Sequence, residues 1–167
     1  MTNRTSSLEQ RILELEDREK IRSLVWSYGH AVDRHRFDEL FALFTEDCVM
    51  DYRPYAEPFR GKAALMKTFL ALPQNHKMTL HLTSDPIINV SGDEASGIWH
   101  WLNPSTGYRE GRERAIWQAG YYSMSYRRNG DDWLISEIKV EYVFSSDHER
   151  GWVEDAMNLP DASGPAS

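Results

Sequence analysis

Residues 113–144, ERAIWQAGYYSMSYRRNGDDWLISEIKVEYVF, hold two long runs rich in aromatic and β-branched side chains, separated by Asn129-Gly130. Such runs favour β-strands, and an Asn-Gly pair between them favours a tight hairpin turn. The stretch therefore predicts strands over residues 113–128 and 133–144, joined as a β-hairpin.

The β-pattern continues on the N-terminal side of this hairpin. Short strands are expected over residues 78–83 and 86–90, and a longer strand over residues 94–103. Ser91-Gly92-Asp93 is typical of a turn, and Pro104, Ser105, Thr106 and Gly107 predict a loop. The second half of the chain is therefore predicted to form an antiparallel β-meander.

The first half is dominated by helical periodicity. Apolar residues recur every three to four positions over residues 8–32, after a capping-box pattern at Ser6 and Glu9, which predicts one long amphipathic helix. Its first turns, up to Glu16, are expected to project beyond the core or to contact a partner subunit. Further predictions are a helix over 37–44 that ends at residues 45–47, a strand over 48–52, a helix over 61–72 and a terminal helix over 147–157.

Helices followed by a meandering sheet indicate the α+β class. A single domain is expected over residues 1–157, and the small, polar residues 158–167 are expected to form a disordered tail. A curved sheet with helices across its mouth would enclose one pocket.

Composition excludes several classes of function. The 167-residue chain has a net charge of −7, with 19 basic and 26 acidic side chains, so binding to nucleic acid or to an anionic membrane is not expected. The polar N-terminus lacks a secretory signal and no apolar run is long enough to span a membrane, which predicts a cytoplasmic protein. Cys48 is the only cysteine, and the six histidines form no zinc motif, so no metal or other cofactor is expected.

Several motifs resemble those of SnoaL-like proteins in the NTF2-like superfamily. Tyr28-Gly29-His30-Ala31-Val32-Asp33 and the following Phe37-Asp38-Glu39-Leu40 resemble the opening of that family. Met50-Asp51-Tyr52-Arg53 is similar to the first-strand motif of scytalone dehydratase. Thr79-Leu80-His81-Leu82 resembles the histidine-bearing strand of that enzyme and of bacterial bile acid 7-alpha-dehydratase.

The resemblance implies a cone-shaped α+β barrel and a set of catalytic residues. His81 and Asp33 correspond to a catalytic dyad, with Tyr28 and Tyr52 as hydroxyl donors to the substrate. The second histidine and the asparagine of scytalone dehydratase align close to Ser105 and Tyr122 of this chain, and the arginine of the bile acid enzyme aligns near Glu141. The resemblance therefore makes Ser105 and Glu141 candidate substrate-binding residues. The resemblance also implies a homo-oligomer, with a trimer favoured and a dimer as the alternative.

The residues fit a cofactor-independent dehydratase. A histidine titrates near neutrality, so it can take a proton from carbon and return it to a departing hydroxyl, and an aspartate on its other ring nitrogen fixes the tautomer. Tyr28 and Asp33 are five residues apart, so they can share a pocket only if the helix ends or distorts near Val32. Aromatic residues are expected to line the pocket for a hydrophobic small molecule, with core packing as the alternative; the candidates are Trp99, Trp101, Trp117 and Tyr122.

Other functions remain open. The same dyad would serve an isomerase, or a lyase that eliminates a different leaving group, because each of these reactions begins with proton abstraction. A binding module for a hydrophobic metabolite needs no chemistry at all, and one fold can host both. The small subunit of a ring-hydroxylating dioxygenase also shares this fold, but it does not need the Tyr28, Asp33 and His81 set.

Overall fold

The chain folds as helices packed on one curved sheet. The computed structural model describes residues 7–71, 73, 77–109, 111–154 and 156–157, so the expected tail over 158–167 lies outside the described residues. Within these ranges the helices are α1 (Leu8–Asp33), α2 (Phe37–Ala42), α3 (Lys62–Leu70) and the short α5 (Gly151–Glu154). The predicted α+β class is confirmed.

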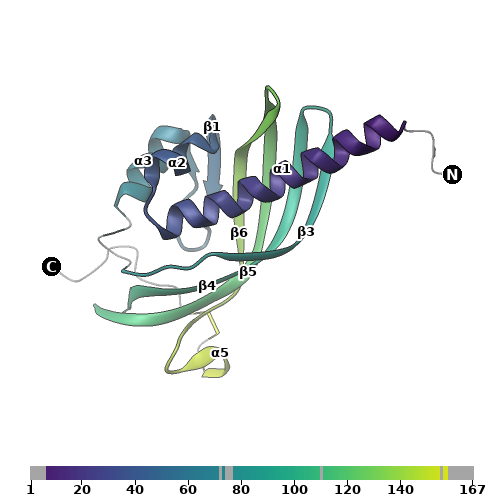
Figure 1. Cartoon of the computed structure of the whole chain (residues 1–167). Coiled ribbons are helices and arrows are strands. Elements are labelled where there is room, and N and C mark those ends of the chain that lie inside the picture. The colour runs from purple at the N-terminus through teal and green to yellow at the C-terminus, as the bar shows by residue number, and fades with distance from the viewer. Residues whose placement is uncertain (1–6, 72, 74–76, 110, 155, 158–167) are drawn as a thin grey trace.

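The sheet has the strand order β2-β1-β6-β5-β4-β3 and is open, with β2 and β3 at its edges (Figure 1). Its neighbours pair antiparallel except β1 and β6, which are parallel. The predicted mostly antiparallel, curved sheet is therefore confirmed. The strands are β1 (Phe44–Asp51), β2 (Phe59–Arg60), β3 (Leu82–Ser91), β4 (Glu94–Arg109), β5 (Arg112–Asn129) and β6 (Asp132–Asp147).

The stretch over residues 113–144 forms the predicted hairpin. Asn129, the last residue of β5, pairs with Asp132, the first residue of β6. Gly130 lies in the turn between them with a φ of 63°, the left-handed conformation that glycine adopts without steric cost. Along β4 every second side chain is buried from Ala95 to Arg109. This alternation gives the sheet one concave face that carries the core and one face towards solvent.

Three predicted β-boundaries are wrong, because long partner strands override local breakers. β3 runs unbroken through Pro86. The residue before the proline, Asp85, has a φ of 49°, and the register of β3 with β4 shifts there. β4 continues through residues 104–107, the predicted loop, since these residues pair with residues 114–117 of β5. β1 begins at Phe44, which pairs with Ile135, so residues 45–47 belong to a strand and do not end a helix.

The helix boundaries also shift by a few residues. The side chain that caps α1 is that of Ser7, in a capping box with Gln10; the predicted Ser6 lies outside the described residues. α2 ends at Ala42 and α3 spans Lys62–Leu70. The terminal helix is limited to Gly151–Glu154, because β6 extends to Asp147.

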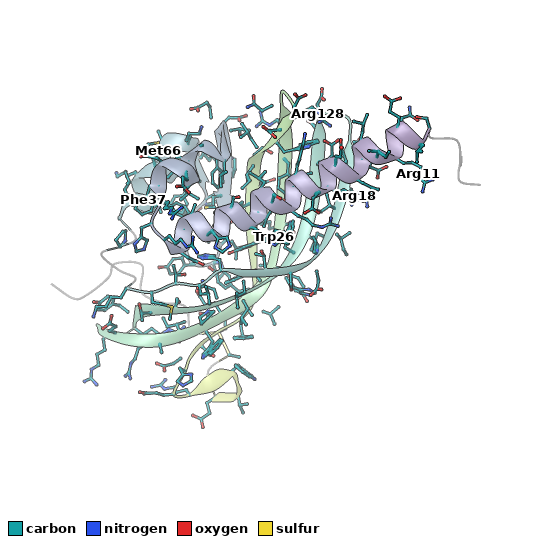
Figure 2. The ribbon with its side chains drawn as sticks, in the orientation of Figure 1. Arg11, Arg18, Trp26, Phe37, Met66 and Arg128 are labelled. Atoms are coloured by element: carbon teal, nitrogen blue, oxygen red, sulfur yellow. The ribbon has the colours of Figure 1, made fainter. Side chains whose placement is uncertain are left out.

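Helix α1 lies across the concave face, and its N-terminal turns extend past the sheet edge (Figure 1). Its middle is fastened to the β5–β6 hairpin by Asp17, whose carboxylate accepts hydrogen bonds from Arg128 at 2.8 and 2.9 Å and from the Trp133 indole at 2.9 Å. Figure 2 shows Arg128 beside α1. No helix in the described ranges combines the length and apolar composition needed to cross a membrane.

The core fills the space between α1 and the sheet. The buried face of α1 presents Ile21, Leu24, Val25, Tyr28 and Val32, and α2 and α3 add Leu40, Phe41, Leu65 and Phe69. These side chains meet Phe44, Met50, Trp99, Tyr126 and Ile138 from the sheet. The core occupies the region near α1, and the strands extend beyond it on the side where α1 ends.

Candidate active site

A histidine–aspartate pair lies where α1 ends. Asp33 is the last residue of α1, and its Oδ1 lies 2.6 Å from Nδ1 of His81. The same carboxylate accepts the backbone N–H of His81, at 2.9 and 3.1 Å. Their side chains are 11% and 14% exposed, so the pair is largely shielded from water.

Backbone pairing holds the His81 segment in place before β3 begins. Thr79 forms a β-bridge with Ser105, and the Leu80 N–H donates to the Pro104 carbonyl at 3.1 Å. On the other side, Gly29 of α1 faces His81: an added Cβ would lie 3.3 Å from the His81 Cβ and from its carbonyl oxygen. Glycine at this position therefore allows the helix and the histidine segment to approach closely enough for Asp33 to reach both groups.

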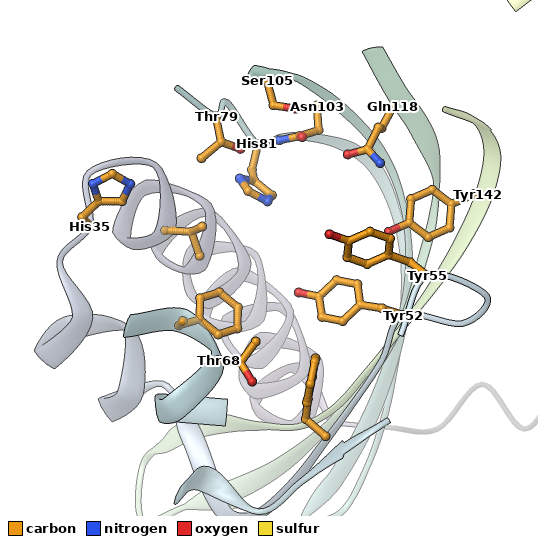
Figure 3. Close-up of a pocket in the computed structure, with 13 residues that line it drawn as sticks. His35, Tyr52, Tyr55, Thr68, Thr79, His81, Asn103, Ser105, Gln118 and Tyr142 are labelled. Carbon is orange, nitrogen blue, oxygen red and sulfur yellow. Dashed lines mark hydrogen bonds between the residues drawn. The ribbon is translucent and has the colours of Figure 1, made fainter. Parts of the chain in front are cut away.

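A cavity of about 140 Å³ opens beside the imidazole (Figure 3). Because Asp33 occupies Nδ1, the Nε2 atom is the ring nitrogen left to act on a ligand. The cavity wall combines apolar side chains with hydroxyl and amide groups. Its lining is Val32, His35, Tyr52, Tyr55, Phe59, Thr68, Phe69, Thr79, His81, Asn103, Ser105, Gln118 and Tyr142.

Tyrosine hydroxyls form one side of the site. Tyr52 lines the cavity and hydrogen-bonds Tyr28, whose ring lies edge-on to the His81 ring with centroids 6.0 Å apart. Burial raises the pKa of Tyr28, Tyr52 and Tyr142 above the usual value for tyrosine. These phenols therefore stay protonated across the physiological range and can donate hydrogen bonds.

Two amides and a hydroxyl form a second polar wall. The Asn103 amide donates to Thr79 Oγ1 at 2.8 Å and to the Leu80 carbonyl at 3.1 Å. The Gln118 amide donates to Ser145 Oγ at 3.2 Å. Figure 3 shows Asn103, Ser105 and Gln118 together beside His81. Since the amide N–H groups of Asn103 are used in these bonds, its oxygen is the atom left for a ligand.

The structure brings part of the predicted site together. His81, Tyr52 and Ser105 line the cavity, whereas Asp33 and Tyr28 lie behind His81 and Tyr52 and reach the cavity through them. The helix end that Tyr28 and Asp33 require is present, since α1 stops at Asp33. Asn103, Gln118 and Tyr142 were missed, although the alternation from Trp101 to Asn103 and from Tyr122 to Gln118 indicated that they share the inner face.

The structure places the aromatic residues predicted as pocket walls outside the lining of this cavity. Trp99 is fully buried in the core, and its indole donates to the Tyr126 hydroxyl at 2.9 Å. Trp101 and Tyr122 stack on each other, with centroids 5.2 Å apart, and are buried outside the lining. Core packing, the alternative reading, accounts for all three.

Trp117 and Glu141 lie on the other face of the sheet. Gln118 points into the cavity, so its neighbour Trp117 points away, and the Trp117 indole donates to His148 Nδ1 at 2.9 Å. Glu141 is exposed, while the adjacent Tyr142 lines the cavity. Strand alternation thus removes both residues from the candidate substrate contacts.

Ligands for a metal ion do not gather at this cavity or elsewhere in the described part of the chain, where no three His, Cys, Asp or Glu side chains form a group. The site is instead defined by a His–Asp pair, phenolic donors and amide groups. These are the elements of acid–base chemistry in a shielded pocket.

Fold and site together define an NTF2-like protein with a ligand-sized pocket on the concave face of its sheet. The SnoaL-like domain family matches residues 13–139, so the chain belongs to this family. An uncharacterized protein of Mycobacterium tuberculosis strain H37Rv is 29% identical over 125 residues, which cover 74% of this chain and 84% of that protein.

Solved structures agree with this fold. A candidate scytalone dehydratase from Novosphingobium aromaticivorans superposes with a TM-score of 0.74 at 21% identity, covering 94% of this chain and 99% of its own. The hexachlorocyclohexane dehydrochlorinase LinA-type3 from Novosphingobium barchaimii gives a TM-score of 0.72 at 18% identity, with 90% and 99% covered. At these identities the likeness establishes the shared fold.

Proposed function

We propose that the protein is a cofactor-independent lyase that removes water from a hydrophobic cyclic β-hydroxy carbonyl compound. The observation that carries the proposal is the 2.6 Å contact between Asp33 Oδ1 and His81 Nδ1, beside a cavity that His81 lines. A carboxylate on Nδ1 keeps Nε2 as the basic nitrogen and stabilises the imidazolium once it forms.

In the proposed reaction His81 acts first as base and then as acid. Nε2 takes the proton from the carbon between the carbonyl and the hydroxyl-bearing carbon, and the electron pair of that C–H bond forms an enolate. As the enolate collapses to the enone, the C–O bond breaks and the hydroxyl leaves with the proton returned from Nε2. One β-hydroxy carbonyl compound therefore yields one enone and one water.

Tyrosine donors support the enolate step. Tyr52 lies in the cavity wall with its pKa raised by burial, and in the free protein its O–H donates to Tyr28. With substrate bound the pair reverses, so that Tyr28 donates to the Tyr52 oxygen and Tyr52 donates to the carbonyl oxygen. A preorganised O–H donor in a shielded site stabilises the charge that develops on the carbonyl oxygen. Tyr142, from the same wall, is a further donor for that oxygen.

The amide wall suits the other end of the substrate. The N–H groups of Asn103 are directed to Thr79 and Leu80, which favours its oxygen as an acceptor for a substrate hydroxyl. Gln118 uses one N–H on Ser145, so its amide can both donate to and accept from that hydroxyl. Ser105 adds a hydroxyl that both donates and accepts. We therefore place the departing hydroxyl near these residues.

Cavity size favours small ring systems. A cavity of about 140 Å³ is close to the roughly 150 Å³ that accommodates a benzene molecule in an engineered protein core. A single ring therefore fits inside the cavity, a second fused ring would reach its mouth, and the four rings of a steroid or bile acid would lie largely outside it.

The decisive experiment is turnover of 3-hydroxy-1-tetralone. Loss of water followed by tautomerisation gives 1-naphthol, which is detected by fluorescence above the enzyme-free rate. His81→Ala should lower kcat/KM by about 10²- to 10⁴-fold, the usual contribution of acid–base catalysis. His100→Ala is the matched control, because that imidazole is 56% exposed and lies on the other face of β4.

Other outcomes identify the alternatives. Conversion without a change of mass would indicate an isomerase. Release of chloride from a chlorinated cyclohexane, the kind of substrate named for LinA-type3, would keep the dyad and change the leaving group. Binding of these compounds without turnover, equal in wild type and His81→Ala, would favour a binding module.

We also propose that the protein is a homo-oligomer. The N-terminal turns of α1 expose Leu8, Ile12 and Leu15 to 70%, 47% and 65%, which is costly for an isolated helix in water. A trimer is the first expectation and a dimer the second. Light scattering distinguishes them, and a monomer at micromolar concentration would contradict the proposal.

A further inference from the structure

His35 occupies a backbone position that usually belongs to glycine. After α1 ends, the His35 N–H donates to the Val32 carbonyl at 3.1 Å and the Arg36 N–H donates to the Ala31 carbonyl at 2.9 Å. This pair of bonds is the Schellman motif, in which the residue after the cap turns left-handed. His35 accordingly has φ of 53°, a conformation that carries a steric cost for residues with a Cβ.

Asp85 is the other non-glycine residue with positive φ in the described ranges, and it provides a comparison. Its φ is 49°, at the bulge of β3. Its side chain accepts a hydrogen bond from Ser84 Oγ at 2.9 Å and lies 3.5 Å from His100 Nδ1. Aspartate also tolerates this conformation better than most residues. Local contacts therefore account for Asp85.

The local contacts of His35 orient its ring. The imidazole stacks on Phe37, with centroids 5.8 Å apart and planes 19° apart, and Phe37 stacks in turn on Phe41. No hydrogen bond reaches the imidazole from the part of the chain that the structure describes. The stack thus positions the ring and leaves its nitrogens for other partners.

The ring also lies in the wall of the cavity described above. His35 lines it, beside the apolar Val32 at the end of α1. In Figure 3 His35 and Tyr142 lie at opposite sides of the cavity, with His81 between them. A ligand that extends from the tyrosine wall towards His35 therefore passes His81.

We propose that His35 is a substrate-binding residue that hydrogen-bonds a hydroxyl or carbonyl substituent at the end of the ligand remote from the tyrosine wall. The inference rests on the proposed function for the placement of the ligand's ketone against the tyrosines. It narrows the substrate class to cyclic ketones that carry a second polar group across the ring system. It also gives a reason for an imidazole where glycine would be less strained.

The test compares the binding of two inert ketones, 1-tetralone and 6-hydroxy-1-tetralone, by calorimetry. One added hydrogen bond predicts that the wild type prefers the hydroxylated ligand by up to about tenfold. His35→Gly and His35→Asn both tolerate positive φ, so neither should lower Tm, and both should reduce the preference to less than about twofold. Asp85→Gly, the matched change at the other strained position, should leave the preference intact.

Three results overturn the inference: a wild type without the preference, a preference that survives in both His35 variants, or variants that lose Tm and weaken both ligands equally. The last result would mean that the imidazole only braces the turn. The binding measurement is independent of turnover. A wild type that shows the preference but does not convert 3-hydroxy-1-tetralone would remove the proposed reaction and leave the role of His35 supported.

Discussion

The carboxylate of Asp33 binds His81 twice, at the ring Nδ1 and at the backbone N–H. The first contact sets the tautomer of the imidazole, and the second fixes the backbone that carries it. Because one group does both, the orientation of the proposed base is tied directly to the last residue of α1.

Asp33→Asn tests this double contact. The amide oxygen can still accept the backbone N–H, so the fold should persist, but a neutral amide cannot stabilise an imidazolium. We expect turnover to fall by roughly 10²- to 10⁴-fold while Tm changes little, measured by naphthol formation and thermal melting. Asp85→Asn is the control, and a variant of Asp33 that keeps more than half of the wild-type rate would contradict the dyad.

Tyr52→Phe removes the cavity hydroxyl without changing the ring. If that hydroxyl stabilises the enolate, kcat should drop by about 10²-fold or more, with a smaller change in KM. Tyr121→Phe provides the comparison, since Tyr121 contacts His100 on the other face of the sheet. Equal rates for the two variants would remove Tyr52 from the mechanism.

Gly29→Ala separates stability from activity. Alanine in a helix interior gains about 1 kcal/mol over glycine, but here its Cβ would lie 3.3 Å from His81, tighter than most contacts. The two effects on unfolding free energy should nearly cancel. The His81 segment must nevertheless shift by a few tenths of an ångström, so we expect a clear loss of kcat at similar urea stability. Unchanged kcat would show that the close approach is not needed.

Buried tyrosines predict alkaline destabilisation. Burial raises the pKa of Tyr28, Tyr52 and Tyr122 in the folded state, so the folded chain keeps protons that the unfolded chain releases above about pH 10. Stability from these groups is therefore present below pH 10 and is lost as the pH rises further, by up to about 1.4 kcal/mol per pH unit for each group.

Thermal melts between pH 8 and 11.5 measure this slope, and Tyr122→Phe should make it shallower. An absorbance titration is the control. If all eight tyrosines of the folded protein ionised together near pH 10, the explanation would not hold.

Periodicity predicted which elements exist but not where each one stops. The hairpin at residues 129–132 and the long first helix follow from local signals, an Asn-Gly turn and an apolar face. The continuation of β4 through Pro104 does not, because it depends on β5 as a partner. The parallel pairing of Phe44 with Ile135 joins segments that no local pattern connects.

The residues of the candidate site also fall into those that the sequence indicated and those that it did not. The resemblance pointed to His81, Asp33 and Tyr52, which lie together in the structure. The aromatic residues were assigned by composition, and composition cannot tell a pocket wall from a core; Trp99 lies in the core. Counting alternate residues along β4 and β5 from the buried Trp101 and Tyr122 was the signal that would have found Asn103 and Gln118.

The parallel pairing of β1 with β6 also constrains how the chain assembles during synthesis. β1 is complete at Asp51, but its long neighbour β6 is not finished until Asp147. The side of β1 that pairs with β6 therefore stays unpaired until the last strand is present. Asp17 likewise cannot complete its hydrogen bonds to Arg128 and Trp133 before then. A ribosome-bound chain stopped before residue 132 would hold the residues of α1 and β1 but not the strand on which they pack, so we expect the native state to form only after β6 has been synthesised.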